Sequence, residues 1–218
     1  MASHLTDDPA YANTRFLVID FEATTPTGRR PEPIDVAVIA LRLHNGHLTE
    51  TSRTEALIQP PAHAPLTRFD IGQTGITGPM LAGQPDAATV LARLDARLDD
   101  SPYLLVAHHA PTEAGILYDY RDHCPHLAAT DFLDTLRLAR IAYPDLPSHR
   151  LDVLIHHLGI PWPPGRHRAM PDVEVTAQVF RQIVAHGAST GHWRTLRQLR
   201  EIGGYPAKGS KPEQETLF

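Results

Sequence analysis

The sequence predicts an α/β domain built on a mixed β-sheet, and two patterns support this fold class. First, three segments rich in apolar and β-branched residues, at residues 16–25, 34–43 and 51–59, follow one another closely, as in a three-stranded antiparallel meander; an Asn-Gly pair separates the last two. Second, shorter apolar segments at residues 103–107 and 132–135 are each followed by a helical pattern, as in parallel strands joined by helices. We therefore expect one mixed sheet flanked by helices.

Amphipathic patterns and helix-breaking residues predict the helices. A helix that begins at Asp86 places apolar side chains from Val90 to Leu98 on one face and ends before Ser101-Pro102. Residues 60–85 are rich in Pro, Gly and Thr, and we expect them to be irregular, with room for one short helix. Further helices are expected from near residue 111, at residues 136–143, at residues 149–158, at residues 171–185 and at residues 192–202.

Composition and charge narrow the class of protein. The chain has 218 residues, 42% of them hydrophobic, which is enough for one large domain with a substantial core. The net charge of −5 excludes a broadly basic surface, so any contact with nucleic acid must be local or assisted by metal ions. A single cysteine, Cys124, excludes an internal disulfide and a multi-cysteine zinc site, and it favours a reducing compartment.

No targeting segment is recognisable in the sequence. Residues 1–14 lack the apolar centre of a signal peptide, and no apolar run reaches the length of a membrane span. We therefore expect a cytoplasmic protein with no membrane partner.

Two acidic residues stand at the end of the first predicted strand. Asp20 and Glu22 are two residues apart, so their side chains point to the same face of the strand. Two like charges about 4 Å apart repel by about 4 kcal/mol at an effective dielectric constant of about 20. A folded chain that keeps both groups ionised needs a compensating cation, usually a divalent metal ion. The alternative is that Asp20 ends the strand and Glu22 is solvated.

Two further segments place an acid in the first turn of a predicted helix. In residues 106–113 a strand passes into a helix that carries Glu113, and in residues 167–172 the loop residue His167 precedes the acid Asp172. Alone, each acid would only complement a helix dipole, which contributes about 0.3–1 kcal/mol, and the histidine would be a surface residue. Together with Asp20 and Glu22, the order and sequence context of these residues favour one shared site over unrelated positions.

These three segments resemble the motifs of the DEDDh family of 3′→5′ exonucleases, which has an RNase-H-like fold and includes the proofreading subunit of bacterial replicative DNA polymerase. Asp20-Phe21-Glu22-Ala23-Thr24 resembles the first motif, Asp-x-Glu-Thr-Thr, and residues 105–113 resemble the second, Val-Ala-His-Asn-Ala-x-Phe-Asp. Residues 167–172 are similar to the third motif, in which a histidine precedes an aspartate by five positions. Gly75-Ile76-Thr77 and residues 134–140 are also similar to the family. The resemblance implies an RNase-H-like mixed sheet.

The chain departs from the family pattern at five positions. Glu113, one methylene longer, stands where the family has Asp, while His109 replaces Asn and Thr112 replaces Phe. Ala23 and Thr25 replace the first Thr and the Gly that follow the leading acids. Glutamate still offers oxygen ligands, but Mg²⁺ requires strict octahedral geometry at about 2.0–2.1 Å. Lower activity, an altered metal preference and loss of activity are all open outcomes.

The resemblance also implies a mechanism, the hydrolysis of phosphodiester bonds with two divalent ions, Mg²⁺ or Mn²⁺. The metal ligands that it implies are Asp20, shared by both ions, Glu22, Asp172 and, through a bound water, Glu113. His167 is the candidate general base, because imidazole titrates near neutral pH. Thr24 and Met170 are candidates for holding the terminal nucleotide. The product would be a nucleoside monophosphate released from the 3′ end of DNA.

The chain ends with Gln214-Glu215-Thr216-Leu217-Phe218, after a stretch rich in Gly, Lys and Pro. This peptide resembles the Gln-x-x-Leu-Phe sequence by which bacterial polymerases and repair proteins bind the sliding clamp. In that case Leu217 and Phe218 would fill an apolar pocket, and the amide of Gln214 would be held by hydrogen bonds. The alternative is an ordinary disordered tail that ends in two apolar residues.

We thus predict four parts: a flexible leader (1–14), an exonuclease domain (15–187), a C-terminal helix (188–204) and a disordered tail with a clamp-binding motif (205–218). The predicted function is a DNA 3′→5′ exonuclease in replication proofreading or repair. Two alternatives stay open. One is a degenerate exonuclease domain, disabled at Glu113, that binds a polymerase or a clamp. The other is an RNA-trimming exonuclease of the same fold, because contacts around the terminal 2′ position decide between the sugars.

Overall fold

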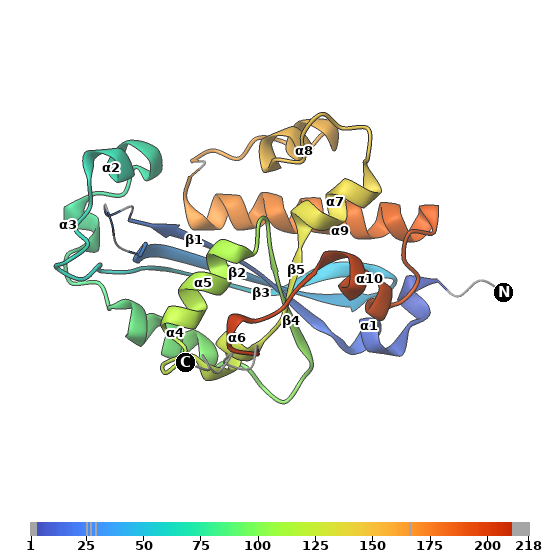
Figure 1. Ribbon diagram of the computed structural model, residues 1–218, viewed down its shortest axis with the longest axis horizontal. Helices are drawn as coiled ribbons and strands as arrows, with labels where there is room; N and C mark the ends of the chain where they lie inside the picture. Colours follow the sequence, from blue (N-terminus) through green and yellow to red (C-terminus); the bar gives the residue numbers. More distant parts are fainter. Residues whose placement is uncertain (1–3, 25, 27, 29, 166, 211–218) are drawn as a thin grey trace, which may run out of the picture.

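The structure, a computed structural model, describes residues 4–24, 26, 28, 30–165 and 167–210. Its centre is a six-stranded sheet with the strand order β3-β2-β1-β4-β5-β6 (Figure 1). β1 is antiparallel to β2 and β2 to β3, whereas β4 is parallel to both β1 and β5, and β6 is antiparallel to β5. The predicted mixed sheet, with a meander and parallel strands, is confirmed. The strands are β1 (Arg15–Ala23), β2 (Pro33–His44), β3 (His47–Leu57), β4 (Tyr103–Ala107), β5 (Phe132–Asp134) and β6 (Gly204–Tyr205).

A two-residue turn, Asn45-Gly46, connects β2 to β3. Both residues have positive φ, 49° and 80°, as a tight hairpin requires and as Asn and Gly adopt most readily. His44 pairs directly with His47, so β3 begins there rather than at residue 51 as predicted. β3 is an edge strand with mostly exposed side chains, so its polar first residues do not carry the apolar signal of a buried strand.

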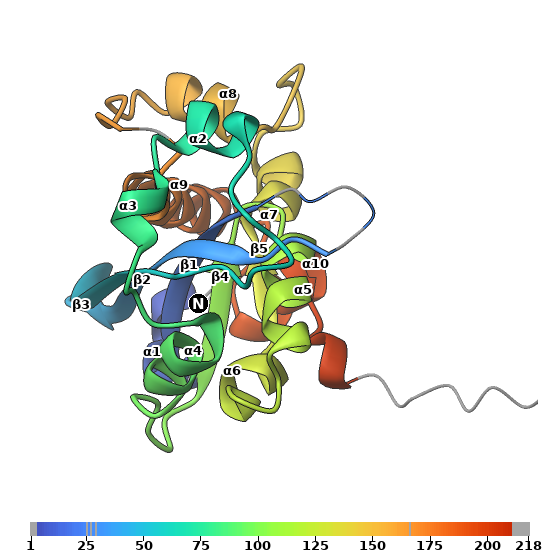
Figure 2. The ribbon, with the colours of Figure 1, turned by 90° about the vertical axis from the view of Figure 1, so that its left-hand side faces the viewer.

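Helices cover both faces of the sheet (Figure 2), and alternate residues of each strand join opposite faces. Phe16 and Val18 of β1 pack on one face, whereas Leu17 and Ile19 pack on the other. The helices of the first face are α7 (Thr135–Ala142), α8 (Leu151–His157), α9 (Ala169–Thr190) and α10 (Leu196–Gly203). Those of the second face are α4 (Ala87–Asp95), α5 (Pro111–Asp119) and α6 (Pro125–Ala129). Among the described helices, none combines the length and the apolar character needed to cross a lipid bilayer.

The Pro/Gly/Thr-rich region at residues 60–85 holds two short helices where the sequence left room for one. They are α2 (Arg68–Thr74) and α3 (Gly78–Leu81). A capping box between Thr67 and Asp70 closes the start of α2, and Gly75 ends it with φ of 68°. Helices this short show too little periodicity for a pattern of apolar residues to reveal them.

The N-terminal segment differs from the flexible leader expected over residues 1–14. From His4 onward it forms the short helices η1 (Leu5–Asp7) and α1 (Pro9–Asn13). Leu5 and Tyr11 are each only 2% exposed and join the core beneath α9. Asp8 Oδ2 accepts a hydrogen bond from the backbone N–H of Leu196, at 2.6 Å. Contacts with residues far along the chain therefore order this polar segment.

The C-terminal part also differs from the single helix expected over residues 188–204. α9 continues to Thr190 and ends at Gly191, whose φ of 82° suits glycine, and the separate helix α10 follows. The expected disordered tail begins instead with β6 and the short helix η2 (Lys208–Ser210), and Ala207 N–H donates to Asp131 Oδ1 at 3.0 Å. The predicted clamp-binding residues lie outside the described residues: Gln214, Leu217 and Phe218.

Candidate active site

Three carboxylates from two distant parts of the chain meet at the end of β1. Asp20 and Glu22 belong to β1, and Asp172 lies in the first turn of α9, which Figure 1 shows above the end of β1. One ligand oxygen from each of the three residues lies within 4.8 Å of the other two. The structure therefore brings three of the predicted metal ligands within reach of a common cation.

Glu113, the fourth predicted acid, comes from the first turn of α5 on the opposite layer. The residue is 5% exposed, and its Oε2 atom is buried without a hydrogen-bond partner among the described residues. The pKa of Asp20 is raised well above its usual value, first by burial and then by the charges of Glu113 and Glu22. Burial also raises the pKa of Glu113 to about 8. Glu113 therefore belongs to the same interacting group of acids.

Buried carboxylates with raised pKa values require either protons or a cation. All four acids offer hard oxygen atoms, the ligands that Mg²⁺ and Mn²⁺ prefer. The buried Oε2 of Glu113 can accept one more polar partner. The donor set and this unpaired oxygen both fit a divalent-metal centre.

His167 is held beside Asp172 by the backbone. It has a φ of 66°, in the left-handed region, and its backbone N–H donates to Asp172 Oδ2 at 3.2 Å. The residue is exposed and borders a hollow of 320 Å³ that His108, His109 and Arg150 also line. An imidazole in this place can exchange protons with solvent next to a candidate metal ligand.

The loop between β4 and α5 is fixed by residues at the end of β5. His109 has a φ of 76°, and its backbone N–H donates to Asp134 Oδ1 at 3.0 Å. His108 Nδ1 lies 2.9 Å from Thr135 Oγ1, and burial lowers the pKa of His108 to about 4, so this imidazole is neutral at pH 7. These contacts set the start of α5 and thereby the position of Glu113.

The two residues predicted to hold a nucleotide have structural contacts. Thr24 is fully buried, its backbone N–H donates to the carbonyl oxygen of Glu32 at 2.8 Å, and its hydroxyl accepts from the N–H of Glu32 at 3.3 Å. These bonds close the loop between β1 and β2. Met170 is partly buried and packs against the core beneath α9. Contact of either residue with a nucleotide stays a prediction.

One acid near the site, Asp35, was not singled out from the sequence. It lies on β2 directly opposite Glu22, is 3% exposed and adds to the raised pKa of Asp20. Its Oδ2 accepts a hydrogen bond from Nε of Arg168 at 2.8 Å. The available signal was an acid inside the apolar run 34–41, because a charged residue is seldom buried without a partner.

Comparison with protein families identifies the family of this chain. Residues 17–180 match the family RNase_T, described as Exonuclease. The matched region contains the four acids and His167. The chain belongs to this exonuclease family.

Its relatives include bacterial DNA polymerases III. The chain is 34% identical over 173 residues to the PolC-type DNA polymerase III of Halalkalibacterium halodurans, a match that covers 79% of this chain and 11% of that polymerase. It is 32% identical over 170 residues to the DNA polymerase III subunit epsilon of Aquifex aeolicus, which covers 78% of this chain and 80% of the subunit. The chain thus spans a small part of the PolC-type polymerases that it matches and most of the epsilon subunit.

Solved structures show the same fold. The nuclease domain of 3′hExo, a DEDDh family member bound to rAMP, has a TM-score of 0.69 at 20% identity, covering 83% of this chain and 96% of that chain. Exonuclease X in complex with 5′ overhanging duplex DNA has a TM-score of 0.61 at 20% identity, covering 87% and 99%. The predicted RNase-H-like fold is confirmed.

Proposed function

We propose that this chain is a metal-dependent 3′→5′ exonuclease domain that releases nucleoside monophosphates from the 3′ end of DNA. The observation that carries the proposal is the meeting of Asp20, Glu22 and Asp172 within 4.8 Å, beside Glu113 and His167. Membership in the exonuclease family supports the reaction class. Homology to DNA polymerase III subunit epsilon favours DNA over RNA as the substrate.

The acids would hold two divalent ions, Mg²⁺ or Mn²⁺, with Asp20 shared between them and Glu22 and Asp172 completing the sites. When bound, the ions would supply Lewis acidity, which makes the attacking water more acidic and stabilises the leaving 3′ oxygen. Glu113 would accept a hydrogen bond through its buried, unpaired Oε2. Cations at this place also allow an acidic site in a chain of net charge −5 to receive a phosphodiester.

His167 would act as the general base. Its exposed imidazole can accept a proton from the attacking water and pass it to solvent. The hydrogen bond from its backbone N–H to Asp172 Oδ2 ties the base to the acid cluster. The hollow beside it, which Arg150 helps to line, offers a place for the adjoining nucleotide and its phosphate. Thr24 and Met170 remain proposed neighbours of the terminal nucleotide.

A parallel assay on matched DNA and RNA tests the proposal. Purified protein is incubated with 5′-labelled single strands of the same base sequence in Mg²⁺ or Mn²⁺, and the double variant Asp20→Asn/Asp172→Asn is the control. We expect stepwise shortening of the labelled DNA from the 3′ end, with nucleoside monophosphate as the only species released, and no shortening by the control. Absence of shortening in both metals would reject the enzyme, and cleavage of RNA alone would make the chain an RNA-trimming exonuclease.

Glu113 supports a second candidate function, an inactive exonuclease domain that binds a polymerase or a clamp. The longer side chain and its raised pKa are what favour this candidate. An inactive domain would cleave neither DNA nor RNA in the parallel assay, even with Mn²⁺. Recovery of cleavage in Glu113→Asp would then assign the defect to this residue.

The partners and the biological role are part of the same proposal. Homology to subunit epsilon supports a polymerase partner, and the terminal peptide Gln214-Glu215-Thr216-Leu217-Phe218 supports a sliding clamp. We place residues 15–187 as the exonuclease domain and residues 205–218 as the segment that carries the clamp motif. Work in replication proofreading or repair, in the cytoplasm, follows from these partners.

A further inference from the structure

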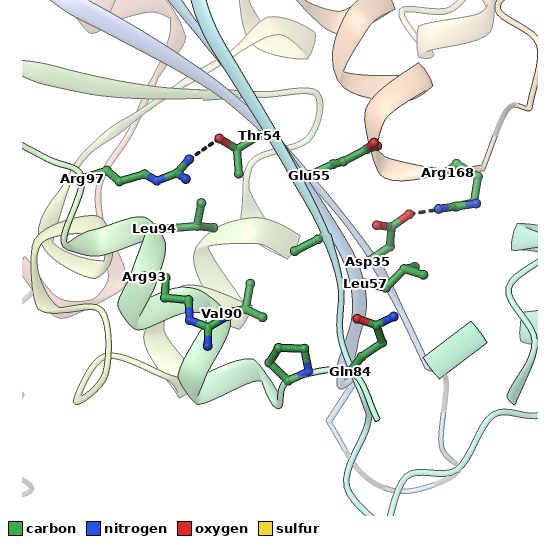
Figure 3. A pocket seen from close by; sticks show the side chains of 12 residues that line it. Asp35, Thr54, Glu55, Leu57, Gln84, Val90, Arg93, Leu94, Arg97 and Arg168 are labelled. Carbon is green, nitrogen blue, oxygen red and sulfur yellow. Dashed lines mark hydrogen bonds and ion pairs between the residues drawn. The ribbon is translucent and has the colours of Figure 1, made fainter. Parts of the chain in front are cut away.

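Arg168 and Asp35 form a partly buried ion pair on the lining of a 480 Å³ pocket beside the acid cluster (Figure 3). Arg168 directly precedes α9, and Asp35 lies on β2, 133 positions earlier in the chain. Nε of Arg168 lies 2.8 Å from Asp35 Oδ2, and the side chain of Asp35 is only 4% exposed. Figure 3 shows the two side chains pointing toward each other from the helix layer and the sheet.

The Arg168–Asp35 pair caps the N-terminus of α9. Arg168 occupies the N-cap position of α9 but makes no capping hydrogen bond with its own side chain. Instead, Asp35 Oδ2 accepts a second hydrogen bond, at 3.3 Å, from the backbone N–H of Ala169, the first residue of α9. An anionic carboxylate at a helix N-terminus is favoured both by the unpaired N–H groups and by the helix dipole. The sheet thereby fixes where α9 begins.

His167 lies one residue before this anchor, in a strained conformation. Its φ of 66° is uncommon for a residue with a side chain, so the surrounding contacts must hold it there. Two carboxylates contact this segment: Asp172 accepts the N–H of His167, and Asp35 binds the next two residues. Loss of the ion pair would weaken the second of these two restraints on the backbone.

We propose that Arg168 is a positioning residue that, through its ion pair with Asp35, holds the backbone of His167 in place next to Asp172 of the acid cluster. The catalytic part of this inference rests on the proposed function of His167 as the general base. Among the described residues, the polar contact of the Arg168 side chain goes to Asp35, which also binds the backbone of Ala169, so we expect Arg168 to act through the backbone next to His167.

Kinetics separate this role from simple stabilisation of the fold. We expect Arg168→Ala to lower kcat by about 10- to 100-fold with little change in KM, the effect of a misplaced catalytic group. In a His167→Ala background the same substitution should lower kcat by less than about twofold, because the group that it positions is gone. Additive losses in the double variant would overturn the proposal. Arg168→Lys keeps the positive charge and the aliphatic part of the side chain, so we expect it to fold. Its kcat should lie between those of Arg168→Ala and the unmodified chain.

Arg53→Ala is the matched control. Arg53 also ties the first turns of α9 to the sheet, since its Nη1 lies 2.5 Å from Glu174 while its Nε lies 2.7 Å from Glu50. Its contacts do not reach residues 167–169. We expect kcat to stay within about twofold of the unmodified chain, because an exposed pair contributes little. If Arg53→Ala lowered kcat as much as Arg168→Ala, any contact that attaches α9 to the sheet would have the same effect on the rate. That result would also overturn the proposal.

A readout without substrate or metal completes the test. Amide hydrogen exchange, followed by NMR on the metal-free protein, should be at least about tenfold faster at His167 in Arg168→Ala than in the unmodified chain, and unchanged in Arg53→Ala. Unchanged exchange at His167 would reject the positioning role. If the unmodified chain cleaves no nucleic acid while this exchange still accelerates, the proposed function fails and the positioning of His167 stands.

Discussion

Replacing Glu113 by glutamine is expected to change how the stability of the metal-free protein depends on pH. Glutamine keeps the shape of the side chain and cannot ionise. Burial raises the pKa of Glu113 from 4.5 to about 8, so the folded protein keeps this proton at pH values where the unfolded chain has lost it. Between these two pKa values the unfolded state binds fewer protons, and the wild-type fold therefore loses stability as the pH rises.

The size of the effect follows from the same two pKa values. One pKa unit corresponds to about 1.4 kcal/mol. Between pH 6 and pH 8 the free energy of unfolding of the wild-type protein should therefore fall by about 2 kcal/mol relative to that of Glu113→Gln. The difference between the two curves contains the ionisation of Glu113 together with the effect of its charge on the pKa of Asp20. At pH 8 we expect the variant to be the more stable protein.

Urea unfolding in a chelator measures this difference. Tryptophan fluorescence reports the unfolding of the core beneath α9, because Trp193 is fully buried there whereas the second tryptophan, Trp162, is already exposed in the folded protein. Addition of Mn²⁺ should then stabilise the wild-type chain more at pH 8 than at pH 6, because metal binding displaces protons from the acids. Parallel pH dependence of the two proteins in the chelator, or a less stable Glu113→Gln at pH 8, would refute the account of Glu113 as a buried acid with a raised pKa.

Three further predictions concern the site and the tail. His167→Ala should lower the rate of DNA hydrolysis by about 10²–10⁴-fold with Mn²⁺ uptake retained in calorimetry, and an unchanged rate would remove His167 from the mechanism. Glu113→Asp should raise the Mg²⁺-dependent rate, because the longer side chain of glutamate weakens a site that requires strict geometry. Steady-state kinetics in Mg²⁺ and in Mn²⁺ measure this rate. A lower rate in both ions would mean that the site has adapted to glutamate. Deletion of Leu217 and Phe218 should abolish capture by an immobilised sliding clamp while nuclease activity stays constant, and equal capture of the truncated chain would refute the clamp motif.

Local patterns predicted most of the elements that carry the site. The apolar strand that ends in Asp20 and Glu22 is β1, and α5 begins at Pro111 as expected for a proline in a first turn. The Asn45-Gly46 turn was also predicted, because its backbone conformation is a property of two adjacent residues. Such features depend on neighbours within a few positions, so a single sequence contains them.

Elements stabilised by distant partners were missed or misplaced. Leu5 and Tyr11 are ordered by the core beneath α9, and β6 exists because it pairs with β5. The ion pair of Asp35 with Arg168 joins a strand to a helix 133 positions away. Nothing in the neighbouring residues of either partner encodes the other.

The sequence by itself determined the mixed α/β fold, the acids at the end of β1 and in the first turns of α5 and α9, and the histidine before α9, because each follows from local order and spacing. Only the tertiary structure decided that Asp20, Glu22 and Asp172 lie within 4.8 Å of one another and that Glu113 is buried against them. The physical reason is that electrostatic repulsion and loss of solvent depend on distance and burial, which arise when segments far apart in the chain pack together.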